Sequence, residues 1–158
     1  MSFIIRKGNK ADLPQVLELI KVLAVFEKAP EEVNLTLEQF KSDGEGDRPY
    51  YHLFVAEMNN TIVGIALYYY GYSTWKGKMM YLDDLVVLEE HRRKGLGKSL
   101  FDALVKEAKE QQAAQIRWHV LDWNEPAIAF YKKINTKLDN EWIKCQFDQE
   151  QINAYSFD

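Results

Sequence analysis

The sequence lacks several features that would assign it to particular classes of protein. A single cysteine, Cys145, excludes an internal disulfide framework and fits a reduced cytosolic compartment. Four prolines and eight glycines in 158 residues are too few, and too scattered, to form a low-complexity linker. No apolar run approaches the roughly eighteen residues that a membrane-spanning helix needs. We therefore expect one domain over residues 1–158, cytoplasmic and without a membrane segment.

A strong net charge is also missing. The chain carries 20 Lys and Arg against 24 Asp and Glu, a formal charge of −4, so neither nucleic acid nor an anionic membrane is expected as a partner. His52, His91 and His119 have no second His or Cys at metal-ligand spacing, so we expect no metal. Cys145, within "EWIKCQF", is expected to be a packed small hydrophobe.

Hydrophobic periodicity predicts the elements of the first half. "FIIR" is typical of a short strand, and apolar residues recur at helical spacing over 13–24. Thr36 followed by Gln39 indicates a capping box that opens a short helix over 37–42. The runs "YYHLFVAEM", "TIVGIALYYYGY" and "KMMYLDDLVVL" are rich in β-branched and aromatic residues and predict an antiparallel meander of three strands.

The second half alternates between helices and strands. We expect a helix from Leu96 to about Gln112, a strand at "AQIRWHVL", a helix at "EPAIAFYKK" capped by Asn124, and a last strand at "EWIKCQF". Asn135 lies where a left-handed residue would end the second of these helices. The fold class predicted is α/β (α+β), with a mixed, mostly antiparallel central sheet flanked by helices.

The stretch "EEHRRKGLGKSL" places four cations and two glycines between a strand and a helix. Backbone N–H groups and the positive end of the helix dipole converge at such a corner, which favours a phosphate ligand. A P-loop would need glycine at Arg92, and a dinucleotide-binding loop would need glycine at Leu100. Neither motif matches.

The pattern that matches is Arg-x-x-Gly-x-Gly, formed by Arg92, Gly95 and Gly97, and it resembles the acetyl-CoA pyrophosphate loop of the GNAT N-acetyltransferases. "DWNEPAIAFYKK" is similar to the segment of that family that contacts the pantetheine arm. "LAVFEKAPEEV", "STWKGK" and "YLDDLVV" are similar to the diamine acetyltransferases of the spermidine/spermine and thialysine type. The resemblance covers 3–147 and implies acetyl-CoA as co-substrate, a small-molecule amine as acceptor, and a homodimer.

The resemblance implies which residues bind the cofactor. The loop would hold the pyrophosphate and backbone groups of the preceding strand would hold the pantetheine, while Asn124, Pro126 and Tyr131 would contact the same arm. The residues concerned are Leu85, Val86, Val87, Arg92, Arg93, Lys94, Gly95, Leu96, Gly97 and Lys98. Tyr131 would also protonate the departing thiolate, although a tyrosine in an aromatic helix is more commonly a core residue.

Carboxylates are expected to bind the amine and to help remove its proton. Asp83 lies where the family often has Glu, and Glu27, in "FEK", matches a contact to a distal ammonium. Strand alternation sends Asp83 and Asp84 to opposite faces, so one at most would line the pocket. A strand-end ion pair for Asp83, and a solvated helix end for Glu27, are the alternatives.

Other residues and functions remain open at this point. His119 could contact the substrate, although a core histidine is the simpler interpretation. The aromatic cluster of Tyr68 to Tyr70, Tyr72 and Trp75 favours sheet packing or a dimer face over base stacking. Acetylation of a peptide or protein amine, and a non-catalytic acyl-CoA-binding module, are the alternative functions.

Overall fold

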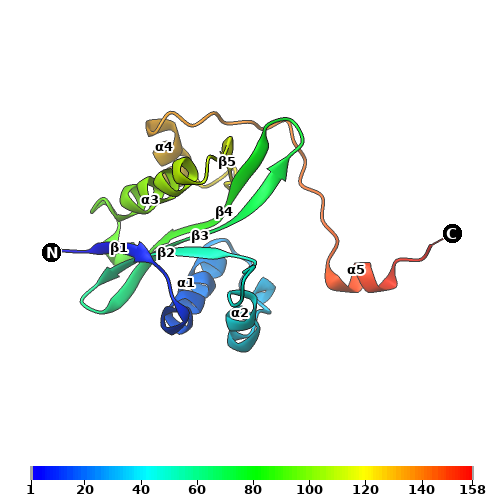
Figure 1. Cartoon of the computed structure of the whole chain (residues 1–158), viewed down its shortest axis with the longest axis horizontal. Helices are drawn as coiled ribbons and strands as arrows, with labels where there is room; N and C mark the ends of the chain where they lie inside the picture. The colour runs from blue at the N-terminus through cyan, green and yellow to red at the C-terminus, as the bar shows by residue number, and fades with distance from the viewer. Residues whose placement is uncertain (1, 158) are drawn as a thin grey trace. The chain divides into compact units, whose positions relative to one another are not determined.

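The structure is a computed structural model that describes residues 2–157. The chain divides into two compact units, which part after His119. The first contains a five-stranded sheet with helices on both faces, and the second contains two short helices (Figure 1). Within the described residues, no helix is both long enough and apolar enough to cross a membrane.

The sheet confirms the predicted meander. Its strands, in spatial order, are β1 (Ile4–Lys7), β2 (His52–Met58), β3 (Thr61–Ser73), β4 (Gly77–Val87) and β5 (Gln115–Arg117). The first four are antiparallel neighbours, and β5 runs parallel to β4. β5 is shorter than the eight residues predicted, because its pairing with β4 covers only Met79–Tyr81.

Two helices cover one face of the sheet and a third covers the other (Figure 1). α1 (Leu13–Phe26) and α2 (Leu37–Asp43) lie on the first face, and α3 (Leu96–Glu110) lies on the second. Pro14 falls in the first turn of α1, where proline is tolerated. The Thr36 side chain accepts the N–H of Gln39 at the start of α2, which is the Thr36 half of the predicted capping box.

The apolar residues beneath α1 and α2 form one core. Its fully buried members come from α1, α2 and the middle three strands: Leu13, Val16, Leu17, Leu19, Phe40, Leu53, Val55, Ile62, Ile65, Leu67 and Val86. This core identifies which side of each strand faces α1.

A β-bulge interrupts the pairing of β3 with β4. Leu67 lies opposite Asp84, whereas the next residue, Tyr68, lies opposite Leu82, so Asp83 is the extra residue. Since Leu67 belongs to the core beneath α1, its partner Asp84 faces that side as well. The alternation of β4 side chains between the two faces of the sheet is therefore interrupted at Asp83.

The bulge makes the prediction of opposite faces for Asp83 and Asp84 wrong. Tyr69 lies two residues beyond Leu67 on the α1 face, and its partner is Tyr81. Asp83 follows Tyr81 by two residues and so faces the same side. Both carboxylates therefore point to the face that α1 covers, which simple period-two alternation cannot produce.

The second unit contains α4 (Glu125–Lys133) and α5 (Gln149–Ala154). α4 is confirmed: the Asn124 side chain accepts the N–H of Ala127, and Asn135 has a left-handed φ of 60°. The last strand, predicted at 141–147, is wrong, since that segment has no regular secondary structure. An alternating pattern specifies two faces but supplies no pairing strand, and the described part of this unit contains none.

Two predictions about single residues are also corrected. Cys145 is exposed rather than packed, because the segment that carries it forms no strand. His119 is exposed rather than a core histidine. In the aromatic cluster, Tyr68 is buried whereas Tyr72 and Trp75 are exposed.

Candidate active site

The N-terminus of α3 forms an open anion site, as the sequence predicts. Gly95, its N-cap, has a φ of 86°, which L side chains rarely adopt, and no side chain caps the helix. The amides of Leu96, Gly97 and Lys98 have no acceptor within the helix, since they belong to its first turn. A Cβ added at Gly95 would meet nothing within 4 Å, so the protein itself leaves this space open. These features fit a diphosphate.

The cations of this loop differ in what they contact. Lys94 donates to the carbonyl of Glu90 at 2.8 Å, and Lys98 pairs with Asp102 along α3. Arg93 adopts a left-handed φ of 61°, and its side chain is exposed. Positive charge thus surrounds the α3 N-terminus and adds to the positive end of the helix dipole, so both favour an anionic ligand there.

One edge of β4 is unpaired next to this loop. β5 pairs with β4 only over Met79–Tyr81, so from Leu82 to Val87 that edge has no partner strand among the described residues. Every second residue of this stretch turns its N–H and C=O to the open edge. The stretch contains Leu85, Val86 and Val87, which the resemblance assigns to the pantetheine, and the Val87 carbonyl also accepts the Nε–H of Arg92. An extended, amide-containing arm could pair with them as a further strand would.

Asp83 and Asp84 share the α1 face of β4, and the charge of Glu27, at the end of α1, acts on Asp84. Burial, together with the charges of Asp83 and Glu27, raises the pKa of Asp84 to about 7. Glu27 follows directly after the last residue of α1. The end of α1 and the β4 bulge therefore form one acidic site.

Asp84 is the residue that sequence reasoning missed. The available signal was the adjacent pair of aspartates inside an otherwise apolar strand, because a bulge is what allows two successive residues to face the same side. Within residues 2–157, no group of three or more His, Cys, Asp and Glu side chains is arranged to hold a metal ion.

Aromatic rings extend the acidic site along the same face. Tyr69 and Tyr81 stack with their ring centroids 5.1 Å apart. Burial raises the pKa of both phenols, and the negative charge of Asp83 adds to the rise. The Tyr81 hydroxyl is hydrogen-bonded to Nδ1 of His119. Carboxylates and the faces of aromatic rings both attract a cation, so a surface lined by them is suited to an alkylammonium group.

The second unit presents the remaining predicted residues. Tyr131 lies in the last turns of α4, where burial raises its pKa to about 12. Its ring contacts that of Phe130 edge-on, with centroids 5.3 Å apart. Asn124 caps the helix and Pro126 lies in its first turn. Burial therefore makes the Tyr131 phenol a weaker acid than an exposed tyrosine.

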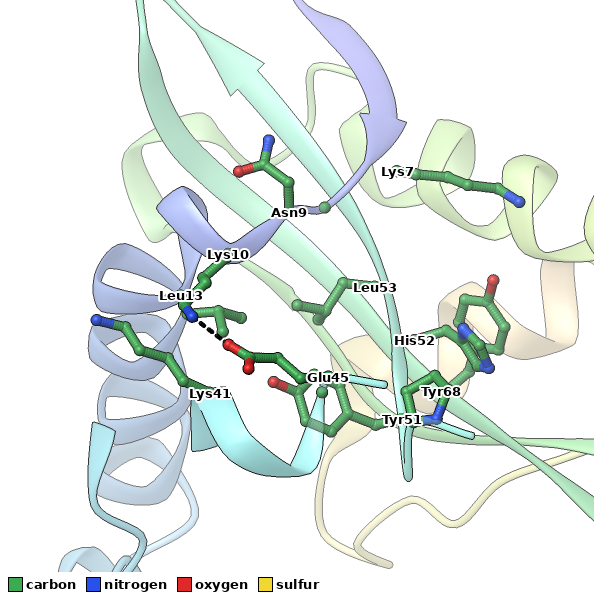
Figure 2. Close-up of a pocket in the computed structure, with 13 residues that line it drawn as sticks. Lys7, Asn9, Lys10, Leu13, Lys41, Glu45, Tyr51, His52, Leu53 and Tyr68 are labelled. Atoms are coloured by element: carbon green, nitrogen blue, oxygen red, sulfur yellow. Dashed lines mark ion pairs between the residues drawn. The ribbon is translucent and has the colours of Figure 1, made fainter. Parts of the chain in front are cut away.

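A separate pocket of about 170 Å³ lies between the end of β1, the start of α1, the end of α2 and the start of β2 (Figure 2). Lys10 forms an ion pair with Glu45 there, and Lys7 pairs with Glu107 at 3.1 Å. The Tyr51 hydroxyl donates to the carbonyl of Phe40 at 2.6 Å. None of the predicted site residues lines this pocket.

Comparison with known proteins agrees with the loop and the fold. The family model described as the acetyltransferase (GNAT) family matches residues 14–135, and the chain belongs to that family. It is accordingly an N-acetyltransferase of the class that uses acetyl-CoA as co-substrate.

The relatives point to one part of the family. The chain is 36% identical to the thialysine N-epsilon-acetyltransferase of Bos taurus, over 96% of each protein. It is 30% identical to the human spermidine/spermine N(1)-acetyltransferase-like protein 1, over 95% of this chain and 23% of that protein. An aminoglycoside acetyltransferase from a soil metagenomic sample, solved with sisomicin, is 19% identical with a TM-score of 0.77 over 92% of this chain and 95% of that one. This last likeness confirms the fold.

Proposed function

We propose that this enzyme transfers the acetyl group of acetyl-CoA to a primary amine of a small diamine, a polyamine or a thialysine-like amino acid. The observation that carries the proposal is the placement of two adjacent aspartates of β4 on one face, together with Glu27. Three carboxylates exceed what one ammonium group needs, and they match a substrate with more than one positive charge.

The cofactor is held by the end of β4 and the start of α3. Asp84 precedes Val87 by three residues, a span of about 10 Å along a strand. The loop amides of 95–98 bind the diphosphate, with Arg93, Lys94 and Lys98 screening its charge, and the unpaired β4 edge binds the pantetheine. The family resemblance assigns Asn124, Pro126 and Tyr131 to the same arm. A backbone N–H among 85–87 stabilises the oxyanion.

Proton removal is part of the barrier, since an alkylamine of pKa about 10.4 is only ~0.1% neutral near pH 7.4. The Asp83–Asp84 pair accepts a proton from the ammonium group, and the neutral amine nitrogen then attacks the thioester carbonyl carbon. The C–S bond then breaks, and the Tyr131 phenol donates a proton to the thiolate. A phenol of pKa about 12 is a weak acid, so it acts by hydrogen-bonding the developing negative charge until the proton moves.

Thiol release measured with a panel of acceptors tests this function. Diamines, polyamines, thialysine and lysine should accelerate CoA release from acetyl-CoA well above the rate of thioester hydrolysis, and monoamines of equal length should do so less. A peptide with a free N-terminus and a protein lysine belong in the panel. If a peptide proved the better acceptor, the substrate class would be wrong; if no amine had an effect, the chain would be a binding module.

Asp83 is expected to sense the second charge of the substrate. Asp83→Asn should raise KM for diamines more than it raises KM for monoamines of the same length. The variant removes one negative charge and keeps the shape of the side chain. Steady-state kinetics with matched pairs of amines measure this. Equal losses on both amines would remove the residue from that role.

A homodimer, a cytoplasmic location and a single domain over 1–158 also belong to this proposal. They rest on the family resemblance and on composition. Sedimentation of the purified chain measures the first of them.

A further inference from the structure

We infer that Phe26 is a positioning residue whose contact with Arg92 holds Glu27 at the acidic site and ties the amine site to the cofactor loop. The inference rests on the proposed function, since it concerns how the same site is assembled. It goes beyond that function because it assigns a role to an apolar residue outside the carboxylate cluster.

The first step is where α1 ends. Phe26 is its last residue, and the N–H of Glu27 still donates to the carbonyl of Leu23 at 2.8 Å. Lys28 then adopts a left-handed φ of 62°, and the chain leaves the helix. Glu27 thus lies at the very end of a rigid element, and its direction depends on how the last turn of α1 is held.

The second step is what lies against that turn. The Phe26 ring is 39% exposed, and the Arg92 guanidinium carbon lies 5.7 Å from the centre of the ring. This distance is within the range of a cation–π contact. The same side chain donates its Nε–H to the carbonyl of Val87 at 3.0 Å.

Arg92 therefore joins three segments. Its backbone starts the loop that leads to Gly95, its Nε holds the end of β4, and its guanidinium covers the end of α1. The family resemblance assigns Arg92 to the pyrophosphate loop, and in the structure its side chain contacts Val87 and Phe26. A link of this kind transmits displacement between the loop and α1.

The third step connects the link to the substrate. Glu27 is adjacent to Phe26 in sequence, and its charge contributes to raising the pKa of Asp84. Loss of the Phe26 ring would free the last turn of α1 and let Glu27 move away from the bulge carboxylates. The cofactor loop would keep its own contacts, because Arg92 would still hold Val87.

The test compares Phe26→Leu with Phe26→Tyr, and uses Val25→Ala as the matched control. Val25 precedes Phe26 on the same turn and is 64% exposed. We expect Phe26→Leu to raise KM for diamines about two- to fivefold, the range of an exposed cation–π contact, with kcat unchanged. Phe26→Tyr keeps the aromatic ring and should have the same KM as wild type.

Two further readouts separate positioning from a general loss of structure. Calorimetric titration with CoA should give the same Kd for Phe26→Leu and wild type within about twofold. Arg92→Met should raise KM for diamines to a similar degree, and the double variant should be no worse than Arg92→Met alone, because one contact has been removed twice. The inference would be overturned if the KM increases of the two single variants multiplied in the double variant. It would also be overturned if Phe26→Leu had the same KM as Val25→Ala.

Failure of the proposed function would be recognised separately. If wild type acetylated no amine, the contact would still be measured by thermal unfolding of Phe26→Leu, Arg92→Met and the double variant. Non-additive stabilities would support the contact, and additive ones would overturn it.

Discussion

Replacing Tyr131 with phenylalanine is expected to lower kcat by about ten- to a thousandfold. The variant removes the phenol that donates to the departing thiolate and leaves the ring, so packing in α4 is preserved. Steady-state kinetics with acetyl-CoA and a good diamine measure the change. Because the phenol acts on the leaving group, the Kd for CoA should change little.

Phe130→Leu provides a matched control for Tyr131→Phe, since it disturbs the adjacent aromatic contact without removing a hydroxyl. Leaving groups offer a second check. A thioester whose thiol is more acidic needs less help to depart, so it should lose less rate in Tyr131→Phe than acetyl-CoA does. An unchanged kcat would remove Tyr131 from the acid role.

Replacing Asp84 with asparagine is expected to have two opposite effects. The activity should fall on the order of a hundredfold, because the variant removes the more buried of the two proton acceptors. The free energy of unfolding near pH 8 should rise by roughly 2 kcal/mol, because the wild type carries a desolvated carboxylate there. For a chain of this length that is about 5 °C in Tm.

The pH dependence gives the sign of the stability effect. Burial raises the pKa of Asp84 from 3.8 to about 7, so between these values the folded protein binds more protons than the unfolded chain. The contribution of Asp84 to the stability of the wild type therefore falls as pH rises from about 4 to about 7, and is level above that. The gain from Asp84→Asn should grow across the same window and vanish near pH 4.

Asp47→Asn, at an exposed position, is the control for the stability measurement. Thermal unfolding at several pH values between 4 and 8 supplies the data. A gain that was the same at every pH would show that the asparagine acts through packing or hydrogen bonding, and Asp84 would then have no raised pKa.

The sequence predicted the parts of this molecule that depend on local patterns. Apolar spacing predicted α1 and α3, β-branched runs predicted the meander, and Thr36, Asn124 and Asn135 marked helix ends that the structure confirms. The GNAT resemblance, based on Arg92, Gly95 and Gly97, is confirmed by the family match.

The predictions that failed depend on pairing between distant segments. The strand predicted at 141–147 needs a neighbouring strand, and no local pattern provides one. The side of the sheet that Asp83 and Asp84 face depends on how β3 pairs with β4. The register shift between Leu67 and Tyr68 cannot be predicted from the sequence of β4 alone. The contact between Arg92 and Phe26, which lie 66 positions apart in the chain, was not predicted at all, because no local pattern indicates it.

The doubled aspartate at the bulge also affects the proton balance of the resting enzyme. In a regular strand, acids on one face are two residues apart, about 7 Å, whereas here successive residues share a face. With the pKa of Asp84 at about 7, roughly half of the molecules at neutral pH hold a proton there. A dication that docks on this face favours the ionised form, so substrate capture would release hydrogen ions into the medium, and the measured heat of association would vary with the ionisation enthalpy of the buffer.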